Sequence, residues 1–551
     1  APWRRAGARK PLRRAAAQPA MTDEEALPTP VDCAISLMLL GSIGFQMVMF
    51  YLVNSPDADI KLYSWQVISQ TISIFCAVLL FQGFNGLVET YIIAGGTEYW
   101  EVFIDMTQLT VWLVAVQVVL AVNSGALNTY LGRGETSKET AERNVHSWSQ
   151  LLEHVAGFAA INAWGSLQQF VFPGSPLATL LALPIGALSL VAMFHGFDTV
   201  REHVAILDDG EKDELEKLWD EASEDAEDEI AGLSLSFITV QSLRFHVLGR
   251  LPDQEGAEPL SALTNHSRSD LASLLGIGFG FFLLSLVPLV VETYYDDRLH
   301  KMHFERREKI VRAISLFNSF FTYGNAWCFF YGMRWALASM QFTEELAVLA
   351  VALALTLSAT SFILIFALDS ARDNMLFGKD TEMAGNAIEK CISSFGVLIG
   401  FSWEQCFDTA VSTIASSNAR TAPPALTKLL LSIILVCIVF PAWRLYILSA
   451  VHEVSNYDSK HGVLKAAADQ HCGLFMSKET DEHVLDLAHL QMKQRRRSAF
   501  NDCHPDGLGP PPGVKHMRVT VGGVVEVKGE DSLRDAAANR RSSASENPFL
   551  Q

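Results

Sequence analysis

Two carboxylates near the end of an apolar segment are the residues most able to do chemistry in this sequence. Glu404 and Asp408 are four residues apart, so on a helix both side chains project from one face. Glu89 stands at the end of an earlier apolar segment, and Arg334 lies within a third. Ionisable residues in such segments are costly unless they face a bundle interior or a water-filled cavity. We therefore predict that these four residues form a polar vestibule or ion site, in which Arg334 neutralises one carboxylate. The alternative is interfacial snorkelling and structural ion pairing near the ends of the spans.

Further polar residues fall at a similar depth in the apolar segments. They are Gln82, Asn85, Gln168, Gln169, Arg244, His246 and Gln405. Their common depth, toward the predicted outer face, is what favours a polar layer over scattered single residues.

A repeated tripeptide lies deeper in two of these segments. Asn162-Ala163-Trp164 recurs as Asn325-Ala326-Trp327, and a Glu-Arg pair precedes each copy at the same distance. The Asn amides can hydrogen-bond between helices while the small Ala allows close approach. We interpret Asn162, Trp164, Asn325 and Trp327 as helix-packing residues, with the lining of a substrate path as the alternative.

Motifs of known catalytic or metal-binding chemistry are missing from the sequence. There is no P-loop, HExxH, GxSxG or His-rich motif, and the eight cysteines show no CxxC or other metal-ligand spacing. The sequence therefore predicts no catalytic residues, no metal ligands, no cofactor and no nucleic-acid partner.

The segments that carry these residues have the length of membrane spans. A bilayer core of about 30 Å needs roughly 20 apolar residues in a helix. The predicted spans are 31–53, 66–91, 102–123, 154–172, 176–197, 231–249, 271–292, 312–336, 344–368, 388–411 and 425–449. This pattern predicts an all-α, polytopic transmembrane bundle of about 11 spans. The count falls to 10 if 231–249, which contains Gln241, Arg244 and His246, does not cross.

The distribution of Lys and Arg favours the larger count. With eleven spans, one set of loops holds fifteen basic residues and the opposite set three. Cytoplasmic loops are enriched in Lys and Arg, so we expect the C-terminus in the cytoplasm and the N-terminus outside.

Internal similarity predicts a four-helix unit used two and three-quarter times. The predicted regions are an N-terminal segment 1–30, an incomplete unit 31–141, complete units 142–304 and 305–449, and a soluble cytoplasmic tail 450–551. The basic stretch 1–20 is either a targeting segment or sequence upstream of a start at Met21. In the tail we expect a helix at 477–497 and a hairpin at 518–528, which would serve partner binding.

Most of the net charge of −19 arises in one loop, predicted at 198–230. Residues 208–229 hold thirteen Asp or Glu against two Lys. Apolar residues recur at helical spacing at Leu215, Leu218, Trp219 and Ala222, which favours a solvated helix. The alternative is a cation-attracting patch at a pore mouth.

The strings LYSWQVISQTISIFCAVLLFQGFN, NAW and GFSWEQCFD resemble a family of multi-pass membrane proteins of dinoflagellate algae. The resemblance covers most of the membrane region. It implies the multi-pass architecture and brings no activity with it.

These observations predict a channel or transporter for an ion or small solute in the lipid bilayer. The alternative is a membrane scaffold or sensor whose tail binds a partner protein. An enzyme is the least favoured class, because no nucleophile, base and metal ligands converge. The sequence leaves the oligomeric state open.

Overall fold

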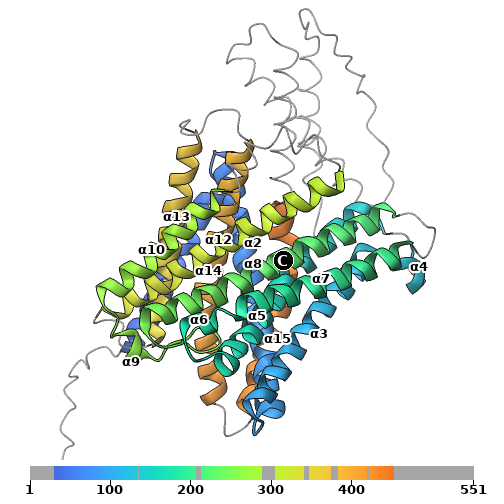
Figure 1. Cartoon of the computed structure of the whole chain (residues 1–551). Coiled ribbons are helices and arrows are strands. Elements are labelled where there is room, and N and C mark those ends of the chain that lie inside the picture. Colours follow the sequence, from blue (N-terminus) through green and yellow to red (C-terminus); the bar gives the residue numbers. More distant parts are fainter. Residues whose placement is uncertain are drawn as a thin grey trace, which may run out of the picture. The chain divides into compact units, whose positions relative to one another are not determined.

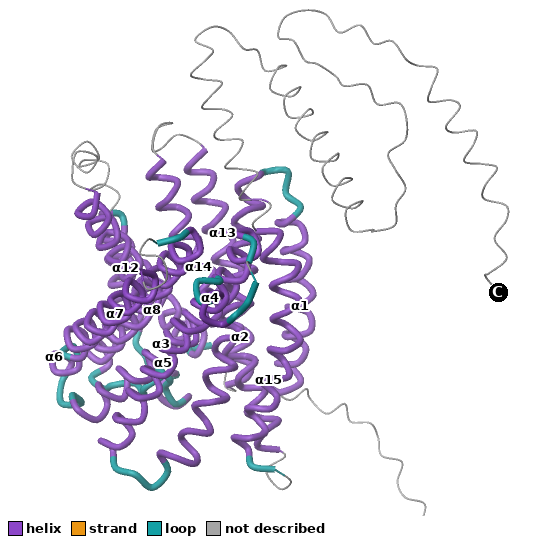
Figure 2. The backbone as a smooth tube through the Cα atoms, turned by 90° about the vertical axis from the view of Figure 1, so that its right-hand side faces the viewer, coloured by secondary structure: helices purple, strands orange, loops and turns teal. Residues whose placement is uncertain are grey.

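The computed structural model describes residues 30–134, 136–206, 212–287, 304–340, 346–373, 382–417, 422–451 and 454 of the 551-residue chain. All of them belong to the first of two compact units, Ala1–Lys465. Within this part of the chain every regular element is a helix (Figure 2). The predictions for residues 1–20, 477–497 and 518–528 lie outside the described residues.

Eleven helices in the described part have eighteen residues or more, and each coincides with most of one predicted span. They are α1 (Pro30–Val53), α2 (Ala58–Val88), α3 (Glu98–Ser124), α5 (Lys138–Ser166), α7 (Ala182–Ile206), α8 (Glu214–Leu248), α10 (Arg268–Ser285), α12 (Phe304–Ala338), α13 (Leu346–Asp373), α14 (Glu382–Ser417) and α15 (Pro424–Ala442). Short helices α4 (Asn128–Leu131), α6 (Pro176–Thr179) and α9 (Leu260–Leu263) lie between them. The π-helical turns η1 (Glu89–Ile93), η2 (Leu167–Val171) and η4 (Trp443–Ile447) extend α2, α5 and α15.

Five of these helices close into a ring. Helix α5 packs on α8, α8 on α12, α12 on α14, α14 on α2, and α2 again on α5. In chain order the five are the second, fourth, sixth, eighth and tenth of the long helices. The other six pack around them; for example, α3 covers α5, α10 covers α12, and α15 covers α2 (Figure 1).

Hydropathy distinguishes four of the five ring helices from the other long helices. Seven segments of the described chain are long and apolar enough to cross a membrane: α1, α2 with η1, α3, α6 with α7, α10, α13, and α15 with η4. The four long helices outside this set, α5, α8, α12 and α14, all belong to the ring. Surrounding helices cover these four, so their polar residues can face protein. By contrast, Leu40 on α1, Leu188 on α7 and Ile438 on α15 are exposed, as lipid-facing residues would be. The number of crossings and the four-helix repeat stay predictions.

The acidic segment is largely helical and is not a loop over 198–230. Helix α7 continues to Ile206 and α8 begins at Glu214. The Asp213 carboxylate accepts hydrogen bonds from the Leu215 and Glu216 amides, and the Glu216 side chain accepts one from the Asp213 amide. The predicted helix is therefore confirmed from Glu214 onward, and the apolar repeat explains it because Trp219 is buried.

Candidate functional site

A polar cavity of about 430 Å³ lies beside the C-terminal halves of α2 and α14 and the turn η2. Its lining residues are Gln82, Asn85, Gly86, Glu89, Gln169, Phe170, Asp253, Gln254, Glu255, Asp408 and Lys428. The lining thus contains four carboxylates and one ammonium group. Two π-helical turns, η1 and η2, contribute Glu89 and Gln169 to it, and such turns are frequent at functional sites. The cavity has the charge of a cation-attracting mouth.

Glycines bring the walls of this cavity together. A Cβ atom at Gly400 of α14 would stand 3.2 Å from the Thr71 Cα atom, and one at Gly396 would stand 3.1 Å from the Gln70 Oε1 atom. On the other side of α2, a Cβ atom at Gly83 would lie 3.3 Å from the Leu429 Cα atom. Small residues allow such close approach of helix backbones. This packing fixes the position of the α2 polar residues relative to those of α14 and α15.

The two carboxylates predicted at the ends of α2 and α14 both line the polar cavity, but each has its own partner. The Asn85 amide donates a hydrogen bond of 2.8 Å from Nδ2 to the Glu89 Oε1 atom. The Lys428 ammonium lies 2.6 Å from the Asp408 Oδ1 atom. Lys428 therefore makes the ion pair that we expected of Arg334.

A smaller axial cavity, about 60 Å³, lies at the centre of the helix ring. All five ring helices line it, together with the segment after α8: Val78, Phe81, Gln82, Phe158, Ile161, Phe237, Glu255, Ala257, Trp327, Phe401, Glu404 and Gln405. Gln82 and Glu255 line both cavities, so the two adjoin. Only 1% of Glu404 is exposed.

Oxygen atoms without protein partners lie along both cavities. The Glu404 Oε1, Gln82 Oε1 and Asn85 Oδ1 atoms are buried and accept no hydrogen bond from the described residues. A buried polar atom of this kind costs free energy, and an ionised carboxylate costs several kcal/mol unless a cation or donor reaches it. Because buried polar groups in proteins are nearly always satisfied, these oxygens indicate a ligand or water site.

Aromatic side chains from α5, α8, α12 and α14 pack together at the axial cavity. Phe401 stacks on Phe158 at a centroid distance of 5.9 Å and meets Trp327 edge-on at 4.9 Å. Trp327 in turn contacts Phe237 at 5.2 Å. Along α14 the order is Phe401, Glu404, Asp408, so a path from the polar cavity would pass the buried carboxylate before the aromatic contacts. We call these four side chains, Phe158, Phe237, Trp327 and Phe401, the aromatic constriction, because all four line the axial cavity and pack against one another.

Arg334 lies apart from the carboxylates it was expected to neutralise. It is buried, but no ion pair joins it to Glu404 or Asp408 in the part of the chain that the structure describes. A neighbouring arginine on α8, Arg244, is also buried and binds the Glu258 carboxylate. The Arg244 guanidinium lies 3.5 Å from the Tyr331 ring centroid, a cation–π contact.

Glu258 is the centre of a saturated polar cluster. Its carboxylate accepts hydrogen bonds from Arg244 and from the Trp335 indole, the latter at 3.2 Å, and lies 3.0 Å from His266 Nε2. Burial alone would raise the pKa of Glu258, but the hydrogen bond from His266 and the charge of Arg244 lower it to about 2. The cluster ties the segment after α8 to α12, and this segment carries Glu255 into the cavities.

A close contact at Gly256 places that segment against α12. Gly256 has a φ of +78°, and a Cβ atom there would stand 2.1 Å from the Tyr331 hydroxyl oxygen. Glu255 belongs to the exposed connection yet lines both cavities. Loss of hydration and the neighbouring charges of Asp253 and Glu89 raise the pKa of Glu255 to about 7. Its charge therefore changes near neutral pH.

The two Asn-Ala-Trp copies have different surroundings. Asn162 and Trp164 are buried on α5, where the Asp105 carboxylate accepts a hydrogen bond from Ser166, one turn beyond Asn162. The Trp164 ring lies against Gly186 of α7, 3.3 Å from where a Cβ atom would stand. On α12 the corresponding residues, Asn325 and Trp327, have different surroundings from each other.

Asn325 faces α10, because its Oδ1 atom lies 3.5 Å from the position of a Cβ atom on Gly278. Trp327 instead lines the axial cavity. Asn162, Trp164 and Asn325 therefore lie in helix-packing surroundings. Trp327 instead lines a cavity, which is where a residue that lines a substrate path would lie.

A second charged cluster lies at the opposite end of α8. The Arg201 Nη1 atom is 2.6 Å from Glu227 Oε1 and 3.0 Å from Gln117 Oε1. Arg312 reaches the same Glu227 carboxylate at 3.2 Å and also binds Asp228. This network joins α3, α7, α8 and α12.

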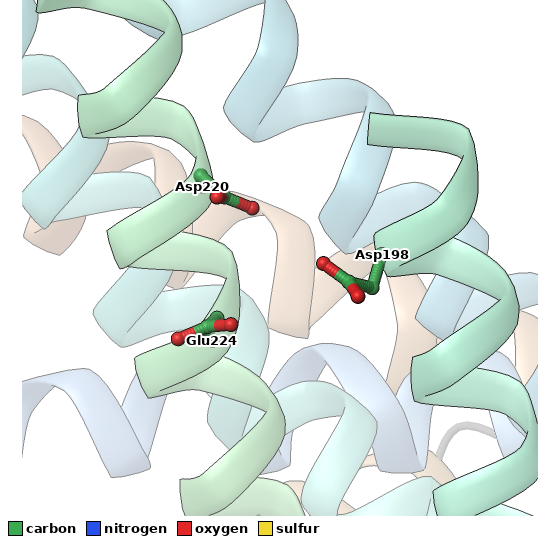
Figure 3. Close-up of side chains that lie close together, drawn as sticks. All are labelled: Asp198, Asp220 and Glu224. Carbon is green, nitrogen blue, oxygen red and sulfur yellow. The ribbon is translucent and has the colours of Figure 1, made fainter. Parts of the chain in front are cut away.

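Three carboxylates beside this network approach one another, as Figure 3 shows. Oxygen atoms of Asp198, Asp220 and Glu224 lie within 4.8 Å of one another, a spacing that suits a metal ion. However, Arg201 Nε and Lys212 Nζ each lie 2.9 Å from Asp220, and an Arg312 nitrogen lies 2.8 Å from Glu224. Partial burial opposes the effect, but the hydrogen bonds from Lys212 and Arg201 lower the pKa of Asp220. Protein cations already neutralise this cluster.

Comparison with known proteins identifies no relative. The sequence matches no family model, and no curated protein or solved structure is detectably similar to the chain.

Sequence reasoning missed Lys428, Glu255 and Glu258. Lys428 stands at the start of a span, and the other two lie in a connection between spans. The spacing Gly396-x3-Gly400 was a usable signal for the α2–α14 contact. The fold-back of the connection after α8 has no comparable signal in the sequence.

Proposed function

We propose that the protein is a multi-pass membrane channel or carrier that moves a cation or small cationic solute along the axis of its five-helix ring. The observation that carries the proposal is the buried Glu404 carboxylate, which has an unpartnered oxygen and lines a cavity at the centre of the ring. The negatively charged polar cavity adjoins it, and the aromatic constriction lies beyond. A charged mouth, a coordinating site and a hydrophobic barrier are elements that channels use for selectivity and gating.

The alternation of inner and outer helices supports eleven spans. If each long helix crosses the membrane once, every second helix runs in the same direction. The ring consists of these alternate helices, and all five contribute to the axial cavity from their C-terminal halves. The N-terminus would then lie outside and the C-terminus in the cytoplasm, with the polar cavity facing outward. The ring would use the first and third helices of each complete predicted unit, together with α2, the middle helix of the incomplete unit.

Single cysteines at Asp213 and Pro259 test this topology, because both positions are exposed. An impermeant thiol reagent applied to intact cells should label Pro259→Cys and leave Asp213→Cys unlabelled until the membrane is permeabilised. Background cysteines are removed first, and labelling of both variants from one face would contradict eleven spans.

Flux through reconstituted protein tests the function. Liposomes that contain the purified chain should exchange a radiolabelled or dye-reported cation, and Glu404→Gln should reduce the rate by at least tenfold. Asp408→Asn should also change the rate, because Lys428 would lose its partner. Glu214→Gln is a matched control, since Glu214 is exposed and pairs with Lys138 on the surface. Unchanged flux in both cavity variants would reduce this polar layer to a structural role.

A solute sensor is the second candidate. The same cavity would bind a ligand without passing it, and the constriction at Phe401 would remain closed. Ligand binding without measurable flux would favour this alternative.

A further inference from the structure

The ligand set at the junction of the two cavities narrows the substrate class. The buried unpartnered atoms Glu404 Oε1, Gln82 Oε1 and Asn85 Oδ1 are all oxygen acceptors. Glu404 lines the axial cavity, Asn85 lines the polar cavity, and Gln82 lines both. The orientation of the Asn85 amide is fixed, because its Nδ2 atom donates to Glu89. Gln82 and Asn85 are three residues apart on α2 and therefore share a face. Hard cations prefer such all-oxygen surroundings.

Charge balance then sets the valence. The Asp408 charge is compensated by Lys428 at 2.6 Å. The Glu89 carboxylate is held by Asn85 at the edge of the polar cavity, where the residue is exposed to solvent. Asp253 and Glu255 also line the cavities, but both residues are exposed in the connection after α8. Among the carboxylates that line the two cavities, that of Glu404 is buried and lacks a cationic partner, so one positive charge would balance it. The axial cavity of about 60 Å³ has room for a dehydrated ion with a water molecule and excludes larger organic cations.

We propose that Glu404, Gln82 and Asn85 bind a dehydrated alkali-metal cation, and that the Lys428 ammonium competes with this cation for the polar cavity. The Lys428 side chain is only 21% exposed and lines the polar cavity that adjoins the axial one. An arriving cation meets a resident positive charge, which weakens its binding and speeds its release. The proposal names the substrate class of the proposed transporter and rests on that function, but binding can be measured without transport.

Titration of the purified protein tests the site directly. Sodium or potassium chloride replaces N-methylglucamine chloride at constant ionic strength, and calorimetry and the thermal unfolding midpoint are followed. The wild-type midpoint should rise saturably with one alkali cation. Glu404→Gln should weaken that binding at least tenfold, yet without alkali cations it should unfold no earlier than wild type, because an unpaired buried charge has been removed.

Two lysine variants test the competition. Lys428→Gln should bind the cation about tenfold more tightly than wild type. Lys138→Gln should leave the affinity unchanged, because the Lys138 side chain is 59% exposed and pairs with Glu214 on the surface. Equal affinities for Lys428→Gln and wild type would overturn the competition.

If Glu404→Gln cannot be obtained folded, Gln82→Leu probes the same ligand set and should weaken binding at least fivefold. An absence of any alkali-specific shift in wild type overturns the site, as does full retention of the shift in these variants. A shift with Ca²⁺ alone overturns the assigned valence. Cation binding without flux would leave the site intact and reject transport, whereas flux without cation binding would reject the site alone.

Discussion

Charged side chains are paired at the N-terminal end of α8, whereas beside its C-terminal end some are left without a partner. At the N-terminal end Arg201 and Arg312 converge on Glu227, and the surrounding carboxylates have cationic partners. Near the C-terminal end the Glu258 cluster is equally saturated, but the adjoining cavities contain more carboxylates than cations and leave a Glu404 oxygen unpartnered. Paired charges join helices, and unpaired buried charges are retained only where a ligand can reach them. The contrast separates residues that hold the bundle from residues that serve the proposed cation path.

Replacing one arginine should produce the largest effect on stability. Arg201→Met leaves Glu227 and Gln117 without their 2.6 Å and 3.0 Å partners, so we expect about 3–5 kcal/mol of destabilisation. Lys428→Met also removes a positive charge, but from the polar cavity. Because its partner Asp408 is partly exposed, this substitution should lower the free energy of unfolding by less than about 1 kcal/mol. Denaturation of both purified variants measures the difference. Equal losses would remove the distinction between the two ends.

Glu258 should show the next largest effect, with a defined pH dependence. Glu258→Gln should cost about 3 kcal/mol, because Arg244 would be left buried and unpaired. The folded-state pKa of about 2 is below the ordinary value of 4.5. The stabilisation is therefore fully present above about pH 4.5 and is lost as pH falls toward 2. Unfolding midpoints between pH 7 and pH 3 check this, and Glu258→Gln should lack this component of the decline.

Glu255 should affect uptake rather than folding. Its raised pKa of about 7 means that it gains a proton as pH falls through neutrality, which removes one negative charge from both cavities. Cation uptake should drop about threefold between pH 8 and pH 6, and Glu255→Gln should be slow and nearly independent of pH across that range. Flux in liposomes with both compartments buffered alike measures the effect. A wild-type profile that is flat would show that Glu255 does not contribute to the path.

The smallest effect is expected at the three clustered carboxylates near the N-terminal end of α8. Asp198 is 37% exposed in its side chain, and Arg201 approaches it only to 3.7 Å. Asp198→Asn should change stability by less than about 0.5 kcal/mol, because exposed ion pairs contribute little. Added Mg²⁺ or Ca²⁺ should not alter the unfolding midpoint through this cluster, since Lys212 and Arg201 already neutralise Asp220.

The sequence predicted the helices better than it predicted which charges meet. Apolar length and helical spacing located all eleven long helices, because both depend on neighbouring residues in the chain. Glu404 and Asp408 share their predicted depth with Gln82 and Asn85, and these residues line the two adjoining cavities. Equal depth alone does not bring residues into contact, because Arg334 was predicted in the same layer and lies apart. Which cation faces which carboxylate depends on helix rotation and order around the ring. Arg334 and Lys428 both lie in predicted spans, and only the packing shows that Lys428 reaches Asp408.

The closed ring has a consequence for biogenesis. Helix α2 is among the first to be made, whereas its neighbours α14 and α15 are among the last. The face of α2 that carries Gln82 must therefore wait, with its glycine-lined surface unpaired, until nearly the whole described chain has been synthesised. Contacts between distant parts of a chain form late and leave intermediates open to wrong partners. Truncation before Glu382 would remove α14, including Glu404, and would leave the ring open. We expect cellular quality control to recognise such a product as an unassembled protein.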